Sequence, residues 1–206
     1  MATVYSDFKS PWCALFTPKE VELLEYFDDM GHWWDLSYGS EINEVIGCAL
    51  MTDVVEAVRE VGVVGKRYKK GIFRFGHAET NVFLMSLMGL YKDDKSLTAN
   101  MTHEHVQNRK FRLSDITPFA SNIIYEVVSC DSGALSGRPA LKVRVVINEK
   151  DVVRLPGCSD AWCPWEEFME SVGKHVGCDW DEVCGLDEMV MNKDERRLWV
   201  QGDGEW

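Results

Sequence analysis

The sequence predicts an α/β fold with a mixed sheet flanked by helices, and the order of its segments carries that prediction. Two helical patterns come first, followed by a short apolar segment that runs directly into another helix. Two strand-like segments and one more short helix come after them. This order is typical of a layered α/β domain, and we assign the two leading helices to a cap.

The first helix has a clear start. Thr17-Pro18-Lys19-Glu20 is a capping box with proline at the first helical position, which predicts a helix over about 18–30. Apolar residues then recur at helical spacing, namely Val21, Leu24, Phe27 and Met30. The tryptophan-rich GHWWDLSYG ends this helix, and a second helix fits 41–61. A disulfide between Cys13 and Cys48 would tie the two helices together.

The segment GIFRFGHAET at 71–80 predicts a strand-to-helix corner. Ile72, Phe73 and Phe75 suit a short buried strand over 71–76, and a helix is expected from about 79 to Met88-Gly89. His77 and Glu79 lie at the corner, where open α/β folds bind ligands and where a helix N-terminus favours anions. The alternative is that His77 caps the helix and that Glu79 is a first-turn carboxylate.

The carboxyl-terminal half contains a predicted strand pair. Residues 120–130 are rich in β-branched and aromatic side chains, and residues 141–150 alternate Val143, Val145 and Ile147 with Lys142 and Arg144. The turn-forming DSGALSGRP between them predicts an antiparallel pair. WEEFMESVGKHV predicts one more short helix.

Charge and hydropathy exclude two function classes. A net charge of −12 argues against a nucleic-acid partner, which would require a basic face. The chain has no apolar run near 18 residues, so no membrane span is expected. Two local basic clusters are either solvated loops or the border of a site for an anionic ligand: Lys66, Arg67, Lys69 and Lys70, and then Arg109, Lys110 and Arg112.

The cysteines predict disulfides. Four of the seven fall within a short Gly- and Trp-containing stretch, namely Cys158, Cys163, Cys178 and Cys184. Such spacing favours a disulfide framework and an oxidising compartment. A zinc site made of Cys158, Cys163, His175 and Cys178 is the alternative, but its spacing matches no common zinc finger. We therefore expect no metal.

Three further features bear on the compartment and on metals. Asn100-Met101-Thr102 is a glycosylation sequon, which fits a luminal or secreted setting. The first residues, MATVYSDFKSPWC, lack the pattern of a signal peptide. His103 and His105 are two residues apart, but few carboxylates are near them in sequence, so we interpret them as part of a solvated loop.

Several stretches together resemble the histidine acid phosphatases, most closely the multiple inositol polyphosphate phosphatase group. FGHAET at 75–80 is similar to the acid motif of that group. Other matches follow in the same order over about 10–170: SPWC at 10–13, YGSEIN at 38–43, LMSLMGLYKD at 84–93, RKFRLSDITPFASNIIYEV at 109–127, VRVVINEK at 143–150 and CPWEEF at 163–168.

The resemblance implies a fold and a chemistry. In this family an α/β domain with an inserted helical domain holds a histidine that attacks phosphate. His77 would contact the transferring phosphoryl group, and Glu79 would protonate the leaving alkoxide. Arg74 and Lys70 would be weaker substrate contacts. Asn122 would support the corner as a structural residue.

The nucleophile motif of the family, Arg-His-Gly-x-Arg, does not occur in these 206 residues. The resemblance therefore implies an incomplete α/β domain: 1–66 as the remainder of a helical cap, 67–175 as the carboxyl-terminal half of the phosphatase domain and 176–206 as a cysteine-containing tail. The family reaction would be cofactor-free hydrolysis of inositol polyphosphates such as phytate, with 2,3-bisphosphoglycerate as a second substrate, and this chain alone would be inactive.

The missing partner would be the amino-terminal half of the same domain. The full-length protein would be secreted, luminal in the endoplasmic reticulum, or lysosomal. The alternative is a non-catalytic secreted module that binds polyanions.

Overall fold

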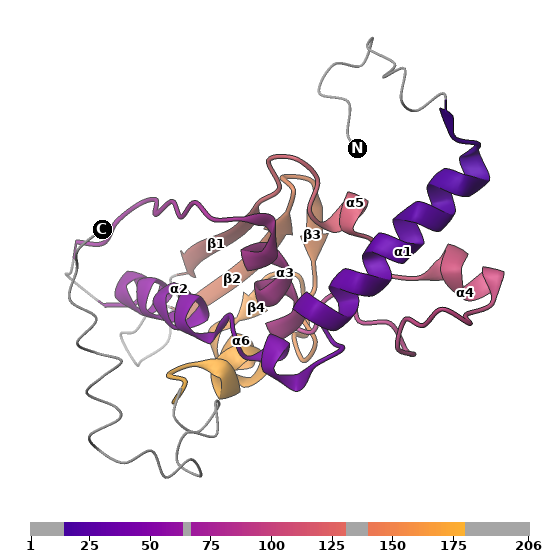
Figure 1. Cartoon of the computed structure of the whole chain (residues 1–206). Helices are drawn as coiled ribbons and strands as arrows, with labels where there is room; N and C mark the ends of the chain where they lie inside the picture. Colours follow the sequence, from indigo (N-terminus) through magenta and orange to yellow (C-terminus); the bar gives the residue numbers. More distant parts are fainter. Residues whose placement is uncertain (1–14, 64–66, 131–139, 180–206) are drawn as a thin grey trace, which may run out of the picture.

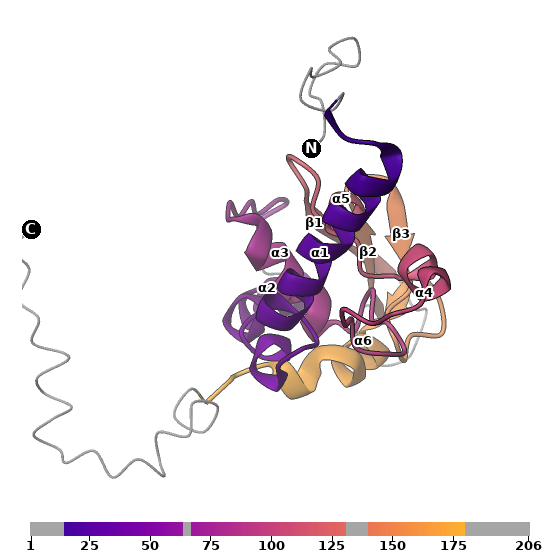
Figure 2. The same ribbon diagram turned by 45° about the vertical axis from the view of Figure 1, so that its right-hand side comes forward.

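A computed structural model describes residues 15–63, 67–130 and 140–179. Its sheet contains β1 (Ile123–Cys130), β2 (Ala140–Ile147) and β3 (Asp151–Val153) in that order, with β4 (Cys163–Pro164) also beside β2. All of these pairs are antiparallel. Helices α2 (Cys48–Val61), α3 (Ala78–Leu87) and α6 (Trp165–Val172) gather on one face of the sheet, and α1 (Pro18–Leu36) lies across α3 (Figures 1 and 2). The predicted α/β class is confirmed.

Helix α1 begins as predicted and runs further than predicted. The Glu20 carboxylate accepts from the Thr17 backbone N–H at 2.7 Å, and the Glu20 N–H donates to Thr17 Oγ1 at 3.3 Å, so both halves of the capping box form. The helix then continues through GHWWDL to Leu36. The expected end near residue 30 was wrong because Trp33, beyond that point, is buried in the core and packs the last turns of the helix against it.

The buried face of α1 is not its apolar stripe. Val21, Leu24 and Phe27 are 48%, 52% and 69% exposed, whereas Tyr26, Asp29 and Trp33 are buried. Polar bonds account for this orientation, because the Tyr26 hydroxyl donates to the Thr98 carbonyl at 2.7 Å and Asp29 binds a buried arginine described below. The stripe is therefore left facing outward in the part of the chain that the structure describes.

The predicted helix over 41–61 is divided in two. A short 3-10 helix, η2 (Glu41–Glu44), precedes α2. The buried Asn43 side chain causes the division, because its amide donates to the carbonyls of Trp34 at 3.2 Å and Ser37 at 3.0 Å and so fixes the turn against the end of α1. Helix α2 then buries Met51, Val55 and Val58 on one face.

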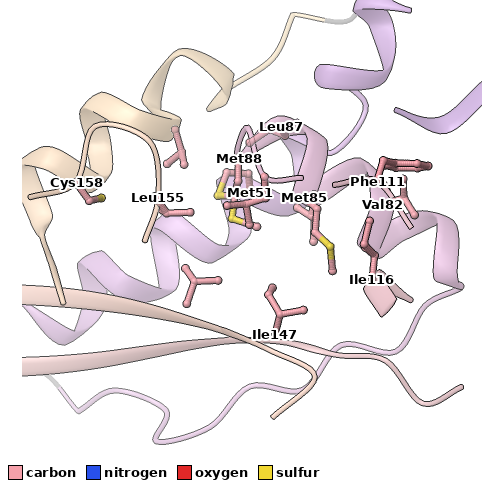
Figure 3. Packing of buried hydrophobic residues seen from close by; sticks show 14 of the residues in the cluster. Met51, Val82, Met85, Leu87, Met88, Phe111, Ile116, Ile147, Leu155 and Cys158 are labelled. Atoms are coloured by element: carbon pink, nitrogen blue, oxygen red, sulfur yellow. The ribbon is translucent and has the colours of Figure 1, made fainter. Parts of the chain in front are cut away.

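Helix α3 passes through the middle of the core (Figure 3). Val82, Leu84, Met85 and Leu87 are all buried, so apolar side chains point outward from several of its faces. Figure 3 shows Ile147 of β2 directed toward the layer of methionines formed by Met51, Met85 and Met88. The helix ends as predicted: Gly89 has φ +72°, which favours glycine, and an added Cβ would lie 3.2 Å from Pro156 Cγ.

The strand predicted at 71–76 does not form. Residues 67–77 are irregular, and no backbone–backbone hydrogen bond joins residues 67–76 to other described residues. Phe73 and Phe75 are 81% and 96% exposed. A strand needs a neighbour to satisfy its N–H and C=O groups, and no strand in the described part of the chain lies beside this segment.

The predicted strand pair is confirmed. β1 and β2 pair from Ile123↔Ile147 to Cys130↔Ala140, and α6 follows them as expected. Phe168 and Val172 of α6 are fully buried, and η3 (Gly173–His175) continues from it. His103 and His105, expected in a solvated loop, lie instead in the short helix α4 (His103–Asn108), and α5 (Leu113–Ile116) comes next. None of the helices in the described ranges is long and apolar enough to cross a membrane.

The capping box of α1 gives a first testable prediction. Thr17→Ala removes the side-chain oxygen that accepts from Glu20 N–H, and we expect it to lower the free energy of unfolding by about 1 kcal/mol. Thr17→Ser keeps that oxygen and serves as the matched control. Urea unfolding of the three proteins measures the difference, and equal losses for Ala and Ser would contradict a capping role.

Candidate functional site

His77 and Glu79 lie at the amino-terminal end of α3. His77 is the N-cap residue, with extended backbone angles, and its side chain makes no capping bond. Glu79 lies in the first turn. Both side chains are exposed, and neither forms a hydrogen bond or ion pair with any residue that the structure describes. His77 thus occupies the N-cap position without making a capping bond, and Glu79 is a first-turn carboxylate as the alternative interpretation expected. Both side chains are available to a ligand.

The corner is held by residues that the sequence did not single out. The Thr80 N–H donates to the His77 carbonyl at 3.1 Å, which closes the first turn of α3. Asn81 Nδ2 donates to Ser121 Oγ at 3.0 Å and anchors the helix to the segment before β1. The sequence did contain a signal for Asn81, because it is a polar residue at the start of the apolar run NVFLMSL.

Asn122 supports a different place from the one expected. Its backbone N–H donates to Asn148 Oδ1 at 3.1 Å, and the Asn148 N–H donates back to the Asn122 carbonyl at 2.9 Å. These bonds join the start of β1 to the end of β2. The Asn122 side chain makes only long hydrogen bonds, to Ala120 and Glu149, so it does not bind the corner itself.

The electrostatics of the corner favour an anion. The first N–H groups of α3 and the positive end of its dipole lie beside His77 and Glu79. Arg74 forms an ion pair with Asp53 of α2 at 2.7 Å, and both side chains are about half exposed. Lys70 is exposed. Neither Arg74 nor Lys70 bonds to His77 or Glu79, so their assignment as substrate contacts stays a prediction.

The second basic cluster is structural. Arg109 is buried, and its Nε donates to Asp29 at 2.8 Å while its guanidinium also donates to Glu25 at 2.8 Å. Arg112 pairs with Glu25 at 2.9 Å, and Lys110 pairs with Asp94 at 3.0 Å. The interpretation of this cluster as the border of an anionic site was wrong, because each of the three cations forms an ion pair with a carboxylate of this chain.

Burial affects the acid at the centre of that cluster. Desolvation raises the pKa of the Asp29 carboxyl above its ordinary value, although the Leu113 N–H and the Arg109 guanidinium oppose this rise. The Leu113 N–H donates to Asp29 Oδ1 at 2.9 Å. Asp29 therefore joins α1 to the 109–113 segment through both of its oxygens.

The cysteines form two disulfides among the described residues. Cys48 bonds to Cys178 across 130 residues, and Cys158 bonds to Cys163. The pairing of Cys48 with Cys13 was wrong. So was the zinc alternative, since its cysteines are oxidised, and no metal-binding cluster of His, Cys, Asp or Glu occurs within the described ranges. Cys13 and Cys184 lie outside the described residues.

The remaining candidates lie away from the corner. His105 contacts Thr102 Oγ1 through Nδ1 at 2.7 Å in the first turn of α4, and His103 is exposed beside it. Asn100 is exposed in the turn before α4. Arg67 and Lys69 are exposed, and Lys66 lies outside the described residues.

Comparison with known proteins places this corner in a family. Residues 4–148 match the model of the histidine phosphatase superfamily, branch 2. The chain belongs to this superfamily. The match includes α1, α2, α3 and the β1–β2 pair, and so both His77 and Glu79 lie within the part of the chain that carries the histidine phosphatase pattern.

Curated relatives and one solved structure agree with the assignment. The histidine phosphatase chain is 36% identical to multiple inositol polyphosphate phosphatase 1 of Homo sapiens, over 91% of this chain and 39% of that protein. It is 30% identical to the Dictyostelium discoideum protein of the same name, over 89% of this chain and 35% of that protein. The crystal structure of the phytase from D. castellii has the same fold, with a TM-score of 0.71 at 24% identity, over 85% of this chain and 36% of that chain. This chain thus spans well under half the length of the relatives it matches.

Proposed function

We propose that these residues form the proton-donor part of a phosphatase that removes phosphate from inositol polyphosphates such as phytate, and also from 2,3-bisphosphoglycerate. The observation that carries the proposal is the unpartnered pair His77 and Glu79 at the N-terminus of α3 in a histidine phosphatase fold. The names of the human and Dictyostelium relatives support this substrate class.

His77 acts on the transferring group. A protonated imidazole at the end of α3 donates to an equatorial oxygen of the phosphoryl group, where negative charge is spread in the transition state. The free N–H groups of the first turn add to the same field. Because the His77 side chain has no partner in the described chain, it can turn toward the phosphate without breaking another bond.

Glu79 acts on the leaving group. An inositol alkoxide leaves poorly unless it is protonated, and a carboxylic acid in the first turn of α3 can supply that proton. The resulting carboxylate then takes a proton from the water that hydrolyses the phosphoenzyme. No metal or cofactor enters either step of this proposal.

The nucleophile is a histidine supplied by a different part of the full-length protein. The other histidines of this chain lie on other elements: His32 on α1, His103 and His105 on α4, and His175 in η3. His32 Nδ1 contacts the Asp28 carbonyl at 2.9 Å, and burial lowers the pKa of His175. We infer that the 206 residues bind phosphate weakly and hydrolyse nothing alone.

Two exposed surfaces support this incomplete-domain proposal. Phe73 and Phe75 project from an irregular segment that ends at His77, and Leu23 and Leu24 project from α1. Large apolar side chains in such positions usually lie against another segment. In this proposal the amino-terminal half of the phosphatase domain pairs with 71–76, and other cap helices cover the first half of α1.

The absence of turnover is the direct test. The purified chain, incubated with phytate, is expected to release phosphate no faster than a His77→Ala/Glu79→Ala control. Release of inorganic phosphate by colorimetry measures this, and turnover that depends on His77 would contradict the inactive-fragment proposal.

The same sample tests the alternative of a polyanion-binding module. Arg67, Lys69 and Lys70 are exposed and have no partner among the described residues, which is the observation in its favour. Calorimetric titration with phytate is expected to show only weak binding. Tight binding that Lys69→Ala/Lys70→Ala abolishes, without turnover, would favour the alternative function.

The disulfides support a secretory compartment. Disulfides persist in oxidising compartments and are rare in the cytosol. The bond between Cys48 and Cys178 joins residues 130 positions apart, and Cys48 is buried while Cys178 is partly buried. We propose that the full-length protein is secreted or resides in the lumen of the endoplasmic reticulum or the lysosome.

A further inference from the structure

We propose that Asn100 carries an N-linked glycan whose first sugars lie in the adjacent hollow at the carboxyl-terminal end of α1. This inference shares only the secretory compartment with the proposed function and does not depend on catalysis. Asn100-Met101-Thr102 is the one Asn-x-Ser/Thr sequence among the 206 residues.

The turn around Asn100 leaves the side-chain amide nitrogen of Asn100 without a hydrogen-bond partner among the described residues. The Met101 N–H donates to the Thr98 carbonyl at 3.3 Å, and Thr98 Oγ1 donates to Asn100 Oδ1 at 2.7 Å. The amide oxygen is thereby fixed, whereas Asn100 Nδ2 donates to no residue that the structure describes. Because Asn100 is exposed, a substituent on that nitrogen requires no rearrangement of the fold.

The third residue of the sequon has a separable structural role. Thr102 Oγ1 accepts from the His105 N–H at 3.4 Å and caps α4. Serine at this position keeps both the cap and the sequon, and alanine removes both. Asn100→Gln removes only the acceptor, so the two roles can be tested apart.

The attachment is a balanced group transfer. Its donor is an oligosaccharide linked through its anomeric carbon to a lipid pyrophosphate. The Asn100 amide nitrogen forms the new bond to that carbon and loses one proton, while the carbon–oxygen bond breaks and the lipid pyrophosphate leaves with the electron pair. No oxidant or metal-bound intermediate is needed. The two disulfides support passage through a compartment where such donors occur.

The hollow beside Asn100 suits sugars. It has a volume of about 440 Å³, and its wall includes Thr98 and Ala99, the two residues that precede Asn100. The opposite wall is α1, with Phe27, Gly31 and Trp34. The Trp34 indole N–H donates to the Leu97 carbonyl at 3.0 Å, which fixes the orientation of a half-exposed ring.

The chemistry of the wall matches a pyranose. An aromatic face packs against the C–H groups of a sugar ring, and carboxylates accept from its hydroxyl groups. Asp28 and Asp35 supply carboxylates on the same wall as the aromatic rings. Since the attachment point and the hollow share one turn, a glycan on Asn100 covers the apolar side chains Phe27 and Trp34, which are otherwise exposed.

Secretion from animal cells behind a cleavable leader tests the attachment. The intact mass is expected to exceed that of the polypeptide by one glycan and to fall on digestion with peptide N-glycosidase, which converts Asn100 to aspartate. Thr102→Ser should keep the glycan, and Asn100→Gln and Thr102→Ala should lose it. An unmodified mass in wild-type protein that has formed both disulfides would overturn the proposal.

A thermal cycle tests the position of the sugars. Removing the glycan enzymatically is expected to lower Tm by about 1–3 °C in the wild type. Phe27→Ser, in the wall of the hollow, should reduce that shift to less than half, whereas Leu24→Ser, similarly exposed on the same helix but outside the hollow, should leave it unchanged. Equal Tm shifts in all three proteins would overturn the packing of the sugars against α1, and only the attachment of the glycan to Asn100 would stand.

Discussion

Glu79→Ala, made in a full-length protein that contains this sequence, is expected to slow phosphate release from phytate by about 100- to 10,000-fold, the range that general acid catalysis contributes. The physical reason is the leaving group, because an inositol alkoxide cannot depart readily without a proton. Single-turnover kinetics with phytate measure the effect on the chemical step. Glu79→Gln keeps the size and a polar end but has no acidic proton, so it should be nearly as slow.

An activated aryl phosphate separates proton donation from other roles of Glu79. Its phenolate leaves without protonation, so Glu79→Ala should slow attack on it far less than on phytate. Glu104 is an exposed glutamate in the first turn of α4, and Glu104→Ala is the matched control, expected to leave both rates unchanged. Equal losses on the two substrates would remove Glu79 from the acid role.

Local signals predicted the elements that depend on neighbours in sequence. The capping box placed the start of α1, Gly89 placed the end of α3, and the alternation around Val143 and Val145 placed the β1–β2 pair. In each case the bonds that define the element join residues a few positions apart, or two strands that adjoin along the chain. The same local pattern placed His77 and Glu79 together at one helix end.

Several of the wrong predictions concern contacts between distant segments. Phe73 and Phe75 have strand-forming side chains, but a strand also requires a partner that the described chain does not supply. Cys48 pairs with Cys178 rather than with a cysteine near it in sequence, and no spacing rule determines such a pairing. The burial of Arg109 is of the same kind, since its carboxylate partners lie some 80 residues away on α1.

Asp29→Ala is expected to lower the free energy of unfolding by about 3–5 kcal/mol, which is a large part of the stability of an ordinary domain. The substitution leaves the Arg109 guanidinium buried without its main counter-charge, and it removes the acceptor of the Leu113 N–H. Urea unfolding followed by circular dichroism measures the loss. Asp28→Ala is the matched control: this acid is the neighbouring residue, its side chain is exposed, and its loss should change stability by less than about 0.5 kcal/mol.

A double variant distinguishes a buried charge from a simple cavity. Removing both charges in Asp29→Ala/Arg109→Met eliminates the unpaired cation, so the double variant should be more stable than Asp29→Ala by about 1–3 kcal/mol. If the loss in Asp29→Ala came only from lost packing, replacing a second large side chain would add to it instead. An additive loss would therefore contradict the ion-pair explanation. Recovered stability in the double variant would show that the ion pair between Asp29 and Arg109 sets the orientation of α1. The apolar stripe of α1 is therefore free to face another partner.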